Sequence, residues 1–366
     1  MNVQDLCNCK LTGPPQGPTE PPQGPTGPDI YSNEIIFHQS KLPTTILIIN
    51  LDKDTDKFNK TYQQSIDNAL FPVRIPAVNG RLELQKCPNV FDKYTTGWCN
   101  YFCTPSMIGI FLSHMKAWKY IVDNNLPSAL IVEDDVILDQ QFQYKIKLLE
   151  KHIPSNWDMI YYGCFLCGKN TYNINMPFGK IKNGGRKIND YVYIPKFAVG
   201  THAYALTNKG AKTLLHKLNK VSGHVDLIMT TTNTDLNVYS FSESLIKQYG
   251  LSENSSNVTH YPYIPNKILD KITLDGEQSI SFYLSSPLCQ VLNYKISSWT
   301  FIFLFIGMLA GFYKMYKLVI IFLIFVIIDI LIASQQSKAT ATDIFINYLG
   351  NLISMVLGFV IASNIS

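Results

Sequence analysis

Hydrophobic and polar positions alternate in blocks between residues 43 and 270, and the blocks have two different periods. Short apolar runs at Ile46–Leu51 and Ala129–Val132 are typical of strands that are covered on both faces of a sheet. Between these runs, apolar residues recur every three or four positions, as they do on one face of an amphipathic helix. The alternation of strand-like and helix-like segments predicts an α/β sheet domain.

Further segments of this region follow the same two periods. Thr104 with Pro105, and Thr207, are residue types that begin helices. Additional strands are predicted at 74–78, 157–162 and 201–206, and the apolar stripes of three helices at 58–70, 107–122 and 211–218.

Three strongly apolar stretches close the sequence, at 296–313, 318–333 and 344–362. They approach the roughly 20 residues that cross a bilayer, although the middle one is short. We therefore expect an integral membrane protein with a C-terminal anchor of three spans, of which the two outer stretches give the stronger signal. The middle stretch contains Asp329, which would cost about 2.5–3.5 kcal/mol at the bilayer centre. Since no cationic partner is evident, we expect Asp329 to reach the membrane interface from near one end of its segment.

Two signals disagree about the side of the membrane on which the domain lies. Lys314 and Lys317 would place their loop in the cytosol and the domain on the opposite side. The segment before residue 43, however, contains no apolar signal sequence. We give the second observation more weight and expect a cytosolic domain, with unmodified sequons at Asn59, Asn254 and Asn257.

Residues 1–42 form a tail rich in proline and glycine, with the repeat PPQGPTE followed by PPQGPTG. Glycine does not recur at every third position, which excludes a collagen triple helix and favours a semi-rigid spacer. A net charge of +4 with 16% charged residues gives no indication of a nucleic-acid partner. We divide the chain into a tail (1–42), a domain (43–270), a connector (271–295) and a membrane region (296–366).

The eight cysteines are scattered along the chain. Cys164 and Cys167 have the spacing of a redox or zinc pair, and Cys99 and Cys103 lie one residue further apart. Neither pair has the surrounding sequence of such a site. We therefore expect reduced cysteines that pack among other side chains.

Three consecutive carboxylates, Glu133, Asp134 and Asp135, follow directly on the predicted strand Ala129–Val132. They would repel one another unless a cation lies among them. Glu133 and Asp135 could both turn toward one divalent ion, and carboxylate oxygens suit Mg²⁺ or Mn²⁺, which also bridge phosphates. Acidic triplets also occur in solvated turns. Ligands of α/β sheets bind beyond the carboxyl ends of the strands, and this position favours a nucleotide-phosphate site.

Short motifs follow one another in a characteristic order between Thr44 and Thr259. In chain order they are Ile49–Asp52, Arg74–Gly80, Ile108–Gly109, Leu112–His114, Ala129–Val136, Trp157–Asp158, Tyr162–Gly163, Ala203–Tyr204, Gly210–Ala211 and His224–Asp226. This ordered set resembles glycosyltransferase family 25, which includes bacterial lipo-oligosaccharide galactosyltransferases and collagen hydroxylysine galactosyltransferases. Asn79, where an aspartate is usual, and Tyr162, in place of a leucine, depart from the family pattern.

The resemblance implies a GT-A fold that uses a sugar nucleotide, a UDP-hexose, with Mn²⁺ or Mg²⁺ and with inversion at the anomeric carbon. A metal held by Glu133 and Asp135 would neutralise the charge of the leaving diphosphate. Asp134 could instead face the ribose or the donor sugar.

Other residues of these motifs are candidates for holding the donor. Asn50 and Asp52 end the first strand, where a nucleotide would lie. Arg74 could pair with phosphate, or it could be an ordinary surface cation. Ser113 and His114 join the donor-binding candidates through the resemblance, although hydrogen bonding within the core is an alternative role for His114.

Direct displacement at the sugar requires a base that takes the proton of the acceptor hydroxyl. Asp226, in the sequence His-Val-Asp, is the candidate catalytic residue; a helix N-cap or an acceptor ligand are its alternative roles. The expected acceptor is a hydroxyl of a glycan, a lipid-linked glycan or a protein. Two other functions fit the same residues: a carbohydrate-binding or scaffolding protein without catalysis, and a nucleotidyltransferase.

Overall fold

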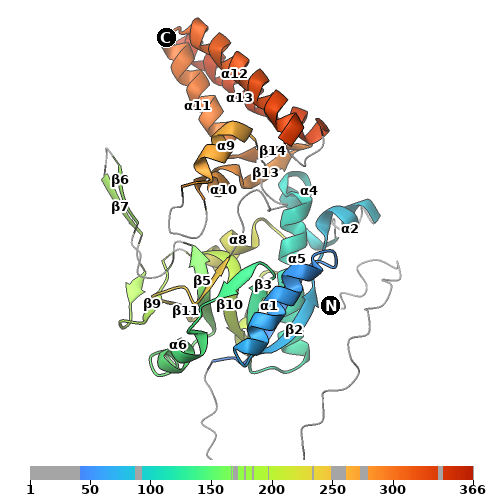
Figure 1. Cartoon of the computed structure of the whole chain (residues 1–366), viewed down its shortest axis with the longest axis vertical. Coiled ribbons are helices and arrows are strands. Elements are labelled where there is room, and N and C mark those ends of the chain that lie inside the picture. Colours follow the sequence, from blue (N-terminus) through green and yellow to red (C-terminus); the bar gives the residue numbers. More distant parts are fainter. Residues whose placement is uncertain are drawn as a thin grey trace, which may run out of the picture.

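The computed structural model describes residues 42–86, 93–165, 167, 172–176, 179–183, 185–196, 198–232, 235–248, 261–272, 279–336 and 341–365. These residues form a sheet domain that is followed by a bundle of C-terminal helices (Figure 1). The Pro/Gly-rich tail, the sequons at Asn254 and Asn257, and part of the predicted connector lie outside the described residues.

The domain is built on one eight-stranded sheet with the order β2-β1-β3-β10-β5-β11-β9-β8. Strand β1 pairs in parallel with both β2 and β3, as expected for a strand that is apolar on both faces. Strand β10 enters antiparallel between β3 and β5, so the sheet is mixed. The prediction of an α/β sheet domain is confirmed. The strands are β1 Thr45–Asn50, β2 Phe71–Pro76, β3 Ser128–Glu133, β5 Met159–Phe165, β8 Arg186–Lys187, β9 Val192–Ile194, β10 Val199–Thr207 and β11 Val238–Phe241.

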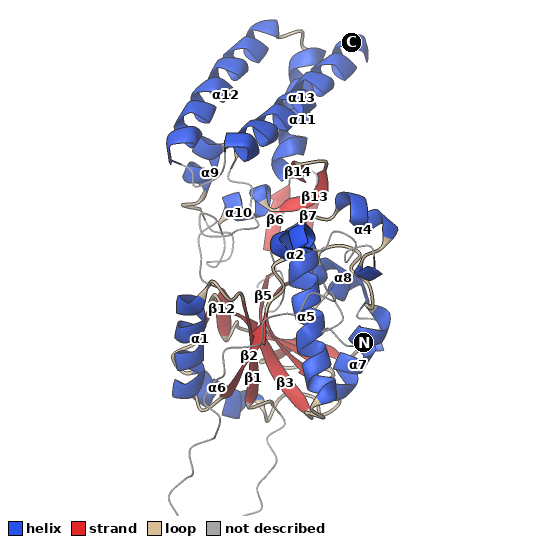
Figure 2. Ribbon diagram, turned by 90° about the vertical axis from the view of Figure 1, so that its right-hand side faces the viewer, coloured by secondary structure: helices blue, strands red, loops and turns tan. Residues whose placement is uncertain are grey.

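Helices cover both faces of this sheet (Figure 2). One buried cluster joins Leu47 and Ile131 to the helices α5 and α7, and the other joins Ile46 and Leu130 to α1 and α6. The helices are α1 Thr55–Asp67, α2 Gly80–Lys86, α4 Gly97–Phe102, α5 Pro105–Asp123, α6 Phe142–Leu149, α7 Asn208–Lys217 and α8 Val225–Thr232. Two small strand pairs complete the domain, β4 Val136–Leu138 with β12 Ile246–Gln248, and β6 Tyr172–Met176 with β7 Gly179–Asn183.

A compact segment joins the domain to the C-terminal helices. It contains α9 Tyr263–Leu269, α10 Ile280–Ser285, and a hairpin of β13 Pro287–Val291 and β14 Tyr294–Ser297. Its side chains share a third buried cluster with the C-terminal helices, in which the indole N–H of Trp299 donates to Asn266 Oδ1 at 2.9 Å. The segment and the helices are therefore packed as one unit.

The C-terminal helices are α11 Ser298–Phe312, α12 Tyr316–Gln336 and α13 Ala341–Ile365. Among the described residues, α12 and α13 are long and apolar enough to cross a bilayer, an indication that rests on length and composition alone. Helix α11 has 15 residues, which reach only about 22 Å. The order of lengths differs from the prediction, since the middle helix is long and the first is short.

Asp329 of α12 contacts the segment that joins the domain to the helices, and its place at a membrane interface stays a prediction. It has no exposed surface, and its two carboxylate oxygens accept the backbone N–H groups of Tyr263 and Ile264, each at 2.7 Å. The hydroxyl of Tyr348 donates to the same carboxylate. The N–H groups of the first turn of α9 satisfy Asp329 in place of a cationic partner.

Helices α11 and α13 approach each other through glycines. A Cβ atom at Gly307 would lie 1.9 Å from the carbonyl oxygen of Met355, and one at Gly358 would lie 2.2 Å from that of Leu304. Gly307 and Gly311 are four residues apart on the same face, a spacing typical of paired transmembrane helices.

Replacing Gly307 with leucine should push α11 and α13 apart and lower the unfolding free energy by at least about 2 kcal/mol. The matched control is Met308→Leu on the exposed face of the same helix, which should have little effect. Thermal unfolding of the full chain in detergent measures both variants. Equal unfolding temperatures for the two would contradict the close packing.

Candidate functional site

The three carboxylates of the acidic cluster lie where β3 ends, beside the end of β1 and the beginning of β10. Glu133 is the last residue of β3, and Asp134 and Asp135 form the turn that leads into β4. Each carboxylate has a different neighbour, so the three side chains do not converge on one point. Within the described part of the chain, no group of three His, Cys, Asp or Glu side chains is arranged to hold a metal ion.

Glu133 faces β10 and the helix α5. The hydroxyl of Thr201 lies 3.3 Å from its Oε1, and His114 Nε2 lies 3.9 Å from the same oxygen. Burial acts to raise the pKa of Glu133, but the hydrogen bond and charge of His114, the charge of His202 and the Thr201 hydroxyl outweigh it, and the pKa is lowered. Glu133 is therefore held as a carboxylate.

Behind Glu133 lies a buried chain of hydrogen-bonding groups. His114 Nδ1 is 2.9 Å from the Tyr204 hydroxyl, and Trp118 Nε1 donates to that hydroxyl at 2.7 Å. The indole can only donate, so the tyrosine hydroxyl accepts from Trp118, and the other ring nitrogen of His114, Nε2, lies 3.9 Å from Glu133. His114 thus acts on the acidic cluster from the core, where the sequence motif Leu112–His114 and the motif Ala203–Tyr204 meet.

Asp134 turns to the other side, toward β1. Its Oδ2 accepts a hydrogen bond of 2.7 Å from Asn50 Nδ2, and its backbone carbonyl accepts one of 2.9 Å from the Thr61 hydroxyl. Burial raises the pKa of Asp134, against the hydrogen bond from Asn50 and the charge of Lys57. Asp134 therefore fastens the acidic turn to the end of β1.

Asp135 is the least compensated of the three carboxylates. Burial, and next the charge of Glu133, raise its pKa to about 7, and a hydrogen bond of 3.1 Å from Gln248 Nε2 acts in the opposite direction. Glu133 and Asp135 are thus a like-charge pair that a cation would relieve. Mg²⁺ and Mn²⁺ commonly take only one or two protein carboxylates and complete their shell with phosphate and water, so this pair fits such an ion when a diphosphate is bound.

Asp226 lies in the first turn of α8 and is joined to the acidic cluster through β10. Its Oδ2 accepts the backbone N–H of Gly200 at 3.2 Å, and the next residue, Thr201, is the one that contacts Glu133. Gly200 has φ of +91°, and a Cβ there would lie 2.7 Å from the ring of Phe165. Both the backbone conformation and the lack of space disfavour a larger residue at this position. The structure brings the candidate base and the candidate metal ligands to the same end of the sheet.

The donor-side candidates Asn50, Asp52 and Arg74 contact one another. Arg74 Nε donates to Asn50 Oδ1 at 2.9 Å, and a terminal nitrogen of Arg74 pairs with Asp52 at 2.6 Å. Asn50 is buried, whereas the Asp52 side chain is 85% exposed. Arg74 therefore has a defined place at the end of β1, and its contact with a phosphate stays a prediction.

Ser113 uses its hydroxyl within the fold. It accepts the N–H of Val78 at 2.8 Å and donates to the carbonyl of Gly109 at 2.7 Å. Strand β2 ends at Pro76, opposite the last residue of β1, and is shorter at this end than the predicted 74–78 strand. A Cβ at Gly109 would lie 2.5 Å from the Val78 carbonyl oxygen. Gly109 and Ser113 therefore both allow the segment after β2 to pack closely against α5. A role of Ser113 in donor binding stays a prediction.

Three neighbours of the cluster were not among the sequence candidates: Thr201, His202 and Gln248. His202 is buried, and its ring packs on Phe165 with centroids 5.0 Å apart. Thr201 and His202 open an apolar strand, and a histidine in a buried strand is the one signal that could have drawn attention to them. Gln248 reaches Asp135 because β12 pairs with β4, a contact between residues 113 apart that local patterns do not reveal.

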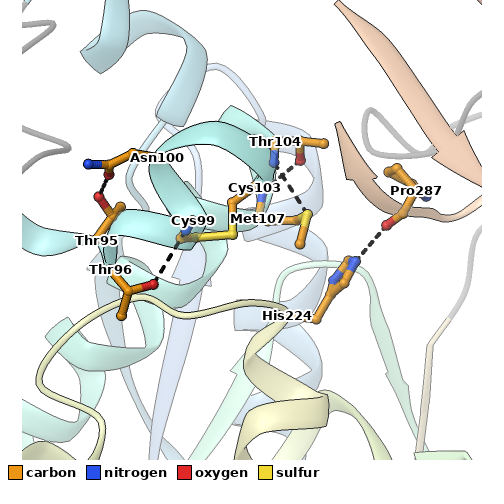
Figure 3. Close-up of a disulfide and its surroundings, with 9 residues drawn as sticks. All are labelled: Thr95, Thr96, Cys99, Asn100, Cys103, Thr104, Met107, His224 and Pro287. Atoms are coloured by element: carbon orange, nitrogen blue, oxygen red, sulfur yellow. Dashed lines mark hydrogen bonds between the residues drawn. A yellow bond between two sulfur atoms is a disulfide. The ribbon is translucent and has the colours of Figure 1, made fainter. Parts of the chain in front are cut away.

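Four cysteines form disulfides, contrary to the expectation of reduced, packing cysteines. Cys99 and Cys103 are bonded at the junction of α4 and α5 (Figure 3), and Cys164 and Cys167 at the end of β5. At the end of α4 the backbone N–H of Cys103 donates to the carbonyl of Cys99 at 2.9 Å, and the Cα atoms of this pair lie 4.6 Å apart, within the range of disulfides. Cysteines three or four residues apart do not by themselves indicate a disulfide, so these bonds were not evident from the sequence.

Comparison with known proteins identifies the family. The model of glycosyltransferase family 25 (LPS biosynthesis protein) matches residues 43–229, just over half of the chain, and the chain belongs to this family. Procollagen galactosyltransferase 2 of Homo sapiens is 26% identical over 183 residues, which cover 46% of this chain and 27% of the relative.

Other relatives give the same picture. Procollagen galactosyltransferase 1 of Danio rerio is 28% identical over 126 residues, covering 32% of this chain and 21% of the relative. Inactive glycosyltransferase 25 family member 3 of Homo sapiens is 25% identical over 206 residues, covering 52% and 32%. The chain thus spans about a fifth to a third of the length of these relatives.

Replacing Asp135 with asparagine should stabilise the metal-free protein. A raised pKa means that the ionised carboxylate is disfavoured in the folded state, so this penalty is absent below the unfolded value near 4, grows as the pH rises and is complete above about 7. We expect a gain of about 1–2 kcal/mol at pH 8 that shrinks as the pH falls toward 4. Thermal unfolding with a chelator, across this pH range, measures it.

The matched control is Asp139→Asn on the same segment. Burial acts to raise the pKa of Asp139, but its hydrogen bond and charge pairing with Lys145 outweigh it and lower the pKa. The control should therefore lose stability, or stay level, at pH 8. A loss of stability in Asp135→Asn at pH 8 would show that Asp135 is not a strained carboxylate.

The disulfides can be tested by alkylating the unfolded, unreduced protein. Cys99, Cys103, Cys164 and Cys167 should stay unmodified until a reductant is added, as judged by mass spectrometry of the peptides. Cys289, a free thiol, should be modified in both samples and serves as the internal control. Modification of Cys99 before reduction would contradict its pairing.

Proposed function

We propose that this chain is a membrane-anchored glycosyltransferase of GT-A type that moves a hexose from a UDP-sugar to a hydroxyl group, with inversion and with Mn²⁺ or Mg²⁺. The observation that carries the proposal is the like-charge pair of Glu133 and Asp135 at the carboxyl end of β3, joined through Gly200 and Thr201 to Asp226. Galactose is the first hexose to test, because the named relatives include galactosyltransferases. The acceptor is a glycan, a lipid-linked glycan or a protein.

In the proposed reaction the acceptor oxygen forms a bond to the anomeric carbon while the bond to the UDP oxygen breaks. Asp226 takes the proton that the acceptor hydroxyl loses. The contacts with Gly200 and Leu227 orient the Asp226 carboxylate, since each of its oxygens accepts one backbone N–H. A metal ion on Glu133 and Asp135 would supply positive charge to the leaving diphosphate.

The residues around the pair would keep the site in shape for this chemistry. Asn50 joins the acidic turn to the end of β1 and to Arg74, which orders the donor side of the site. His114 and Thr201 hold Glu133 ionised, as a metal ligand must be.

Asp135→Asn should remove metal-dependent release of UDP from UDP-galactose. Loss of one of two metal carboxylates should lower the rate by roughly 100-fold or more. The assay compares wild type, Asp135→Asn and Asp139→Asn across UDP-galactose and UDP-glucose, each with Mn²⁺ and with chelator. The Asp139 variant should stay within about twofold of wild type, because its carboxylate pairs with Lys145 outside the cluster. Undiminished activity of Asp135→Asn, or activity in chelator, would contradict the metal role.

The alternative of a carbohydrate-binding protein without catalysis is favoured by one observation, the name of the inactive family member among the relatives. The same assay, together with binding measurements, distinguishes these functions. Glycan binding with no UDP-sugar binding supports the alternative, and release of pyrophosphate in place of UDP would indicate a nucleotidyltransferase.

The disulfides bear on which side of the membrane the domain lies. Two disulfides in the domain favour an oxidising compartment. They agree with Lys314 and Lys317, which had favoured a domain opposite the cytosol in the sequence. We therefore infer a domain outside the cytosol, in place of the cytosolic position expected from the sequence.

A further inference from the structure

Two elements in contact expose large apolar side chains at the end of the domain that faces the C-terminal helices. Helix α4 packs against β13, and both lie between the sheet and the helices in Figures 1 and 2. We call this the α4–hairpin surface, and it consists of Trp98, Tyr101, Leu288, Val291 and Leu292. Leu292, at the turn of the hairpin, is 89% exposed, and Tyr101 is 77% exposed. Such a group of side chains on one end of a domain marks an interaction surface.

The hairpin is continuous with the C-terminal helices. Strand β14 ends at Ser297, and α11 begins at the next residue. The hydroxyl of Tyr294 donates to Asn351 of α13 at 2.8 Å, and a Cβ at Gly350 would lie 2.3 Å from the Tyr294 ring. The helices themselves expose apolar side chains along their length: Phe301, Phe305, Ile321, Ile324, Phe345, Leu349, Ile353 and Leu357. The α4–hairpin surface therefore borders the surface that lipid would cover.

The domain is fixed in this orientation by contacts beside the candidate site. His224, two residues before Asp226, has its Nε2 2.6 Å from the carbonyl oxygen of Pro287 (Figure 3). On the other side, the ring of Tyr283 in α10 meets the ring of Phe165 edge-on, with centroids 6.0 Å apart. A domain on a free tether would not need these contacts.

The residue types identify the partner. Tryptophan and tyrosine are enriched where a bilayer meets water, because one part of the ring is apolar and the other hydrogen-bonds. On β14, burial and next the charge of Arg81 lower the pKa of Lys295, and the charge of Asp343 acts in the opposite direction. The exposed apolar and aromatic side chains of the α4–hairpin surface suit the headgroup region of a membrane.

We propose that the α4–hairpin surface lies in the headgroup region of the same bilayer that the C-terminal helices enter. The domain then rests on the membrane, with the carboxyl end of its sheet toward the lipid surface. This inference rests on the membrane anchoring that forms part of the proposed function, and it is independent of catalysis.

Quenching of tryptophan fluorescence by lipids brominated at a shallow acyl position tests the proposal on the full chain in vesicles of phosphatidylcholine with phosphatidylglycerol. Leu292→Trp places a probe on the surface, and Tyr144→Trp is the matched control, since Tyr144 is 69% exposed on α6. After subtraction of the wild-type signal, the probe at 292 should be quenched at least about twofold more than the probe at 144.

A second variant tests the same surface in case Leu292→Trp does not fold. Trp98→Phe keeps the ring that stacks on Phe102 and should remove part of the quenchable wild-type emission. Equal quenching of both probes, together with an unchanged quenchable fraction in Trp98→Phe, would overturn the proposal and leave the surface to a protein partner. Sedimentation of the vesicles after an alkaline wash is the separate test of anchoring: protein lost from the vesicles would refute the anchoring and this inference together, without bearing on UDP release.

Discussion

Glu133 and Asp135 carry like charges at the end of a strand whose four central residues, Ala129–Val132, are fully buried, and the domain is arranged around this conflict. Strand β3 is paired with β1 and β10, so its end cannot move away to separate the charges. The fold compensates Glu133 through His114 and Thr201 but leaves Asp135 with a raised pKa. This uncompensated pair is the physical basis of the proposed metal site.

The sequence was informative wherever a structural cause is local. Apolar runs located β1, β3 and β10, and Thr104 with Pro105 located the start of α5, because strand burial and helix capping depend on neighbouring residues. The surroundings of the cluster were not local. His202 and Gln248 reach it only through the antiparallel entry of β10 and the pairing of β12 with β4. The order of motifs located the acidic cluster and its neighbours Asn50 and His114, but not His202 or Gln248.

Asp329 shows a second limit of sequence reasoning. A carboxylate in an apolar segment directs attention to cations, and none was evident. The partners are instead the backbone N–H groups of Tyr263 and Ile264. Every residue except proline has a backbone N–H group, so the sequence does not indicate which of them will bind a carboxylate. The N–H groups of Tyr263 and Ile264 can donate because they belong to the first turn of a helix. The hydrogen bonds that satisfy Asp329 also fix the position of α9 against α12.

That fixed position has a consequence for the role of the helices. Asp329 holds α9, Trp299 holds Asn266 within α9, and the segment that follows meets the domain at His224 and Phe165. Each contact is polar or aromatic, and together they form an unbroken series from the middle of α12 to the neighbourhood of Asp226. Flexible linkers orient nothing, whereas such a series restricts how the domain can turn relative to the helices. If the helices enter a bilayer, the orientation of the domain is set by the fold itself, and so is the angle and height at which an acceptor would approach the proposed base Asp226.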